Sequence, residues 1–82
     1  MSDIPLSKGR AVKELRAHID ATCEALGRML GVSRQTVSYW EDETHSPTDL
    51  HLIKLVKIAR KSRASKEVVD AFESGIGREA RA

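Results

Sequence analysis

The sequence predicts an all-α protein, a compact five-helix domain whose second and third helices are joined by a sharp turn. Apolar residues recur three and four positions apart, which is the spacing of one buried helix face. Sustained period-two alternation, the pattern of a strand, is absent, and aromatic residues make up only 4% of the chain. With 82 residues, the chain has room for one small domain.

The first two helices are predicted from their caps and apolar spacing. We expect the first over residues 8–19, with Ser7 as its N-cap and apolar side chains three and four positions apart. The second follows Thr22, a good N-cap, and stops at Gly31, about eight residues later. The third begins after Ser33, so only three residues separate the two helices. This spacing favours a sharp turn over an antiparallel hairpin.

Two further helices complete the expected domain. The fourth has Ser46 as its expected N-cap, Pro47 in the first helical position and Asp49 in the first turn. Ser65 is the expected cap of the fifth helix, which ends at Gly75. We therefore divide the chain into an N-terminal arm (1–7), a domain with a C-terminal dimerisation helix (8–75) and a flexible tail (76–82).

Composition excludes several classes of function. A single cysteine, Cys23, rules out an internal disulfide and a thiolate-rich zinc site, and the three histidines have no metal-ligand spacing. No signal peptide and no membrane-spanning stretch are recognisable, which predicts a cytoplasmic protein. No catalytic constellation or glycine-rich phosphate loop is present, so we expect no enzyme, cofactor or small-molecule ligand. The net charge of +2 is too mild to indicate nucleic-acid binding by itself.

The most informative segment is TCEALGRMLGVSRQTVSYWE, residues 22–41. It resembles the helix-turn-helix of the Cro and lambda-repressor-like family, and the resemblance extends over roughly residues 12–59. It implies that the third helix enters the major groove of DNA. The residues that match the family pattern are Gly27, Gly31, Val32, Ser33, Val37, Trp40 and Glu41.

The matching positions also have physical reasons. Gly31 permits a left-handed turn, and Gly27 allows the two helices to approach closely. Val37 and Trp40 bury the back of the third helix and leave its front free to read bases. Tyr39 could instead pack beside Trp40, and the whole front could be a solvated face. The candidate base-reading residues are Arg34, Gln35, Ser38 and Tyr39.

Phosphate contacts are expected around this front. The resemblance implies that Arg16 pairs with Glu41 and points toward a phosphate, and that Cys23 replaces a phosphate-binding glutamine. Asp42 and Glu43 are expected near the DNA backbone, where they weaken binding. The candidate phosphate-contacting residues are Arg16, Thr22, Cys23, Ser33, Thr36, Thr44 and His45.

Function and assembly follow from these expectations. The sequence predicts a sequence-specific transcriptional regulator of a bacterium, phage or plasmid, which acts as a homodimeric repressor on a palindromic operator in double-stranded DNA. The alternative is an antitoxin-type protein-binding module with secondary DNA binding, although only about 20 residues follow the fourth helix. Spare apolar surface is expected to hold the dimer together, and the residues concerned are Val68, Val69, Phe72 and Ile76.

Overall fold

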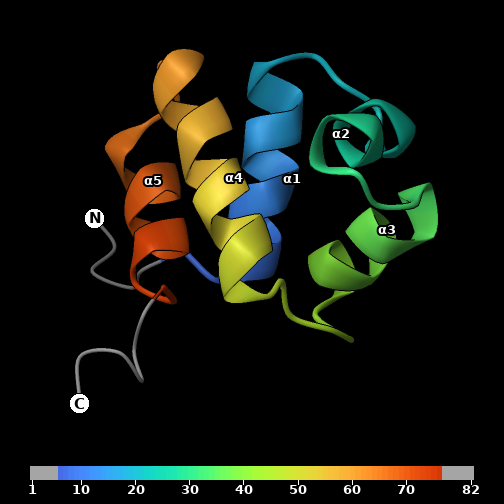
Figure 1. Cartoon of the computed structure of the whole chain (residues 1–82). Helices are drawn as coiled ribbons and strands as arrows, with labels where there is room; N and C mark the ends of the chain where they lie inside the picture. Colours follow the sequence, from blue (N-terminus) through green and yellow to red (C-terminus); the bar gives the residue numbers. More distant parts are fainter. Residues whose placement is uncertain (1–5, 77–82) are drawn as a thin grey trace.

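The computed structural model describes residues 6–76 and contains five helices and no strand in that part of the chain (Figure 1). This architecture confirms the predicted all-α fold. The arm residues 1–5 and the tail residues 77–82 lie outside the described part, so the predicted flexibility of the tail is not addressed. The helices are α1 (Lys8–His18), α2 (Cys23–Leu30), α3 (Arg34–Asp42), α4 (Asp49–Lys61) and α5 (Lys66–Glu73).

Every helix begins after a serine or threonine whose hydroxyl accepts a hydrogen bond from a backbone N–H three residues later. This contact satisfies one of the N–H groups that a helix leaves unpaired at its start. Four of the five caps are the predicted ones. The caps are Ser7, Thr22, Ser33, Thr48 and Ser65.

The start of α4 corrects the prediction for the fourth helix. Its N-cap is Thr48, whose hydroxyl accepts from the backbone N–H of His51, and not Ser46. Pro47 is buried in the connection between α3 and α4 and does not occupy the first helical position. A residue that precedes a proline is held in extended conformation, so Ser46 and Pro47 continue the loop. Thr48 has the extended backbone and the hydroxyl that a cap requires.

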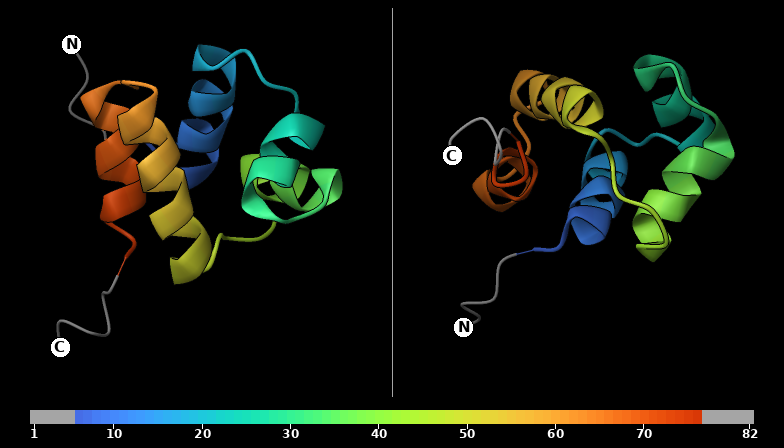
Figure 2. Two further views of the ribbon diagram at one scale, coloured as in Figure 1. Left: turned by 45° about the horizontal axis from the view of Figure 1, so that its top comes forward. Right: turned by 60° about the horizontal axis from the view of Figure 1, so that its bottom comes forward.

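The core is built around α1. Figures 1 and 2 show α1 between the α2–α3 pair and the α4–α5 pair, and α1 packs against both α3 and α5. All five helices contribute apolar side chains to one cluster. Its buried members are Ala11, Val12, Leu15, Leu26, Leu30, Val37, Trp40, Leu52, Leu55, Val56, Ala59, Val68, Ala71 and Phe72.

The position of α5 corrects the expectation of spare apolar surface. Phe72 is completely buried and Val68 is 2% exposed, so both side chains belong to the core of their own chain. Val69 and Ile76 are half-buried and pack against the same cluster. A small domain has few apolar residues to bury, and this one needs α5 to cover the open side of α1 and α4. Among residues 6–76, the large apolar residues that remain exposed are Met29, Tyr39, Leu50 and Ile53.

Candidate nucleic-acid interface

The turn between α2 and α3 depends on two glycines. Gly31 ends α2 with φ of 77°, in the left-handed region that residues other than glycine rarely adopt. The backbone N–H of Val32 then donates to the carbonyl of Gly27 at 2.8 Å. A Cβ on Gly27 would lie 2.7 Å from the carbonyl oxygen of Val32, which is too close. Both glycines therefore fix the angle at which α3 leaves α2, as predicted.

The helix α3 has a buried side and an exposed side. Val37 is completely buried and Trp40 is 3% exposed, so the back of α3 is anchored in the core. The opposite side presents mainly hydrogen-bonding groups to solvent. The structure brings all four candidate base-reading residues together there: Arg34, Gln35, Ser38 and Tyr39.

Tyr39 belongs to this exposed side and does not pack beside Trp40 in the core. Its hydroxyl accepts a hydrogen bond from Nε2 of Gln35 at 2.8 Å, and its ring lies 4.9 Å from the ring of His45. The ring of Trp40 instead faces His51, at 5.3 Å. Gln35 and Tyr39 therefore form one hydrogen-bonded unit on the front of α3.

An ion pair joins α1 to the end of α3. Nε and Nη2 of Arg16 donate to the two carboxylate oxygens of Glu41 at 2.7 and 3.2 Å, and Nη1 donates to the carbonyl of Ala21 at 3.3 Å. The hydrogen bond to Glu41 raises the pKa of the Arg16 guanidinium above its ordinary value, more than burial lowers it. The predicted pair is therefore present, and Arg16 keeps only part of its N–H groups for a phosphate.

The N-terminus of α2 lies beside this ion pair, at the C-terminal end of α3. Cys23 is the first residue of α2, is half-buried, and its Sγ lies 3.9 Å from Oε2 of Glu41. The hydroxyl of the cap Thr22 accepts from a backbone N–H group, so its own hydrogen remains available to an anion. The hydroxyls of Ser33 and Thr36 share one hydrogen bond, so one of their two hydrogens remains available. A cavity of about 400 Å³ lies between the start of α2 and the exposed side of α3, and it is lined by Cys23, Arg34, Gln35 and Ser38.

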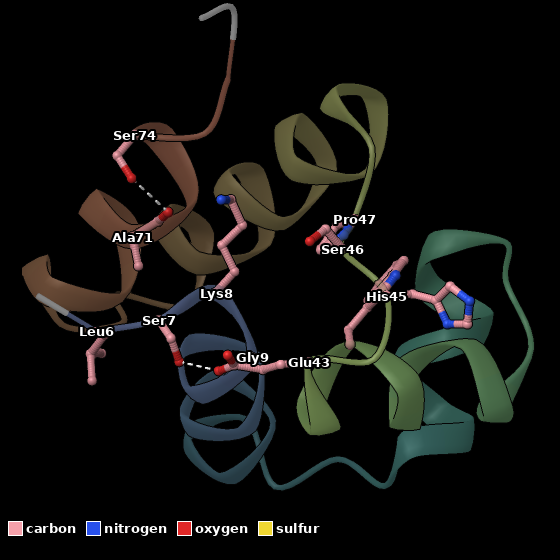
Figure 3. A pocket seen from close by; sticks show the side chains of 11 residues that line it. Leu6, Ser7, Lys8, Gly9, Glu43, His45, Ser46, Pro47, Ala71 and Ser74 are labelled. Atoms are coloured by element: carbon pink, nitrogen blue, oxygen red, sulfur yellow. Dashed lines mark hydrogen bonds between the residues drawn. The ribbon is translucent and has the colours of Figure 1, made fainter.

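The loop after α3 contains a contact that the sequence prediction missed. Glu43 has φ of 65°, and its carboxylate accepts a hydrogen bond from the hydroxyl of Ser7, the N-cap of α1 (Figure 3). The positive end of the α1 dipole attracts this carboxylate, so Glu43 has a partner within its own chain. No spacing rule relates residues 36 positions apart, so the sequence held no signal for this contact.

The other candidate residues of this loop have exposed side chains. Thr44 and His45 both donate their backbone N–H groups to the carbonyl of Tyr39, at 3.0 and 3.3 Å. Asp42 is exposed at the end of α3. Thr36, half-buried on α3, shares a hydrogen bond with the hydroxyl of Ser33 at 3.0 Å. Thr44 and His45 are thus held at the edge of the α3 front.

Residues 6–76 contain neither a candidate metal site nor a candidate membrane-spanning helix. No group of three or more histidine, cysteine or acidic side chains in this range is arranged to hold a metal ion. Likewise, none of the five described helices has the length and apolar character needed to cross a membrane.

The comparisons with known proteins agree with this geometry. A family model described as helix-turn-helix matches residues 12–65, well over half of the chain. Neither the search of curated proteins nor the search of solved structures found a match. The matched range contains α2, the glycine turn and α3 together with the helices that support them. The chain belongs to the Cro/C1-type helix-turn-helix family of DNA-binding transcription regulators.

Proposed function

We propose that the protein is a dimeric repressor that inserts α3 into the major groove of a palindromic operator. The observation that carries the proposal is the front of α3, where four side chains with hydrogen-bonding groups are exposed while Val37 and Trp40 anchor the back. An α-helix fits the major groove, and the residues near its N-terminus then reach base edges.

Arg34 and Gln35 are the proposed specificity residues. Arg34 is the first residue of α3, is exposed, and has no acidic partner among the residues that the structure describes. Its guanidinium is therefore free to donate two hydrogen bonds to O6 and N7 of a guanine. Gln35 suits N6 and N7 of an adenine, and the hydroxyl of Tyr39 holds its amide in position. Ser38 adds a hydroxyl one turn further along.

Contacts to phosphates are proposed to fix the register of α3 on the duplex. Several groups near the reading face favour an anion. They are the hydroxyls of Thr22, Ser33 and Thr36 and the backbone N–H groups at the N-termini of α2 and α3. Cys23 lies between them as a weak donor. The remaining proposed contacts come from Arg16, Thr44 and His45.

A second subunit is proposed because one α3 helix reads too few base pairs for useful specificity. Two-fold dimers of this kind read half-sites about 34 Å apart. The subunit measures 33 × 30 × 25 Å, a size compatible with this spacing when two subunits lie side by side. Val68 and Phe72 are buried, so the proposed contact is made by Leu50 and Ile53, which are 60% and 40% exposed on α4.

The test is the selection of bound sites from random duplex DNA, followed by sedimentation of the complex. We expect a palindrome with half-sites one helical turn apart and two chains per duplex, and an operator placed over a promoter should reduce transcription of a reporter. Leu50→Asp combined with Ile53→Asp should abolish the dimer. Met29→Asp is the matched control, since Met29 is 52% exposed on α2. One chain per duplex at every concentration would contradict the dimer, and no enriched sequence would favour the antitoxin-type alternative.

A further inference from the structure

An apolar groove lies away from the front of α3. It is formed by the connection between α1 and α2, the exposed side of α2 and the C-terminal part of α4, and it has a volume of about 350 Å³. The α1–α2 connection and the end of α4 lie at the top of Figure 1, whereas α3 lies at the lower right. The groove shares no residue with the cavity between α2 and α3. Its lining residues are Ile19, Ala21, Met29, Ile58, Lys61 and Ser62.

One wall of the groove is basic. Lys54, Ile58 and Lys61 are spaced four and three residues apart, so they follow one another along the same side of α4. Both lysines are exposed, and neither has an acidic partner among residues 6–76, whereas Arg60 of the same helix pairs with Glu73. Ile58 is half-buried between them. The wall therefore combines an apolar contact with two uncompensated positive charges.

The opposite wall differs in charge. The α1–α2 connection places the exposed Asp20 between the lining residues Ile19 and Ala21, and its φ is 56°. Met29 adds a flexible apolar side chain, of the type that adapts to differently shaped partners. An occupant should therefore carry apolar groups at its centre, and it should carry negative groups only on the side that faces α4.

We propose that this groove docks a segment of a partner protein in which apolar side chains are flanked by carboxylates. A second copy of the chain fits poorly, because a two-fold contact centred here brings the two lysine rows together and like charges oppose association. A DNA duplex fits poorly as well, because the floor of the groove is apolar. The groove and the α3 front have no residue in common, so a docked segment leaves the proposed reading residues uncovered.

The experiment uses two synthetic helical peptides with identical leucine positions, one carrying glutamates and the other lysines between them. The full chain is labelled at its methionine and isoleucine methyl groups and titrated with each peptide. The acidic peptide should shift the methyl signals of Met29 and Ile58, and the basic peptide should shift neither. Lys54→Glu combined with Lys61→Glu should weaken the acidic peptide about tenfold or more. The titration is made well below the melting temperature of the double variant, because a glutamate at Lys61 opposes the dipole at the end of α4.

Lys13→Glu is the control variant. Lys13 is exposed on α1 and has no acidic partner in the described part of the chain, so its reversal changes the net charge without touching the groove. It should alter peptide affinity less than about twofold. The proposal is overturned if Lys13→Glu weakens binding of the acidic peptide as much as Lys54→Glu alone or Lys61→Glu alone does. It is overturned as well if millimolar acidic peptide leaves the methyl signals of Met29 and Ile58 unshifted. It is also overturned if the double reversal weakens only DNA binding, because the row then contacts phosphates.

Discussion

The helices α3 and α4 both present one side to solvent, but the two sides have different chemistry. The whole of α3 contains one cation and two carboxylates, and its front offers a guanidinium, an amide and hydroxyls. In contrast, α4 contains four cations and one carboxylate, and its exposed side combines lysines with Leu50 and Ile53. The proposed sequence reading through hydrogen bonds and the proposed association through apolar and charged surface therefore involve separate helices. We therefore expect α3 to contribute to sequence specificity and to add little non-specific electrostatic attraction for phosphates.

The largest effect on stability is expected at the buried back of α3. Trp40→Ala should lower the free energy of unfolding by about 3 to 5 kcal/mol, because it removes the large side chain that fixes α3 against the core. This loss approaches the whole stability of a small domain, often about 5 kcal/mol. Tyr39→Ala is the matched control, since Tyr39 is the neighbouring residue but is 36% exposed. Urea denaturation of both variants is the measurement, and equal losses would show that α3 has no distinct buried side.

The next effect concerns the ion pair that holds the end of α3 to α1. Arg16→Ala should lower the free energy of unfolding by about 1.5 to 3 kcal/mol, because the side chain of Glu41 is only 9% exposed and its carboxylate loses two charge-assisted hydrogen bonds. A double-mutant cycle with Glu41→Ala checks this, since the double variant should recover part of the loss. Additive losses in the cycle would mean that the pair contributes nothing to stability.

Arg16 also gives a test of phosphate binding that is separate from stability. At a temperature where the variant is folded, Arg16→Ala should weaken binding to all duplexes and reduce the slope of log K against log salt by about one. Arg16→Lys keeps the charge but loses the bidentate geometry, so its slope should stay that of the parent. An unchanged slope in Arg16→Ala would show that Arg16 acts only through Glu41.

Unlike Arg16→Ala, a substitution on the front of α3 should affect operator binding more than binding to random DNA. Arg34→Ala should weaken operator binding by about 1 to 3 kcal/mol, relax the preference at one base pair in each half-site, and affect random DNA much less. Stability should change little because Arg34 is exposed and unpaired in the described part of the chain. Titration of operator and random duplexes measures both quantities. An intact base preference would show that another element reads the sequence.

The sequence predicted the features of this molecule that depend on local patterns. Residue type and spacing identified the five helices, the glycine turn and the two sides of α3, because each follows from interactions among residues that are close in the chain. The contact between Ser7 and Glu43 and the burial of Phe72 depend on how distant helices pack. An apolar face on α5 fits an interface and a core equally well from sequence alone. Only the position of α5 beside α1 and α4 decides between the two.

The smallest effect concerns the start of α4, where sequence and structure name different capping residues. Thr48→Ala should lower the free energy of unfolding by about 1 kcal/mol, because the hydroxyl of Thr48 accepts from the backbone N–H of His51 at 3.4 Å and lies 3.0 Å from its Nδ1. Ser46→Ala should change it by less than about 0.5 kcal/mol, since Ser46 is exposed in the loop. Thermal melts of the two variants in parallel make the comparison. If Ser46→Ala lowers the free energy of unfolding as much as Thr48→Ala does, then α4 begins at Pro47 in solution. Leu50 and Ile53 then lie on a helix that is longer at its N-terminal end.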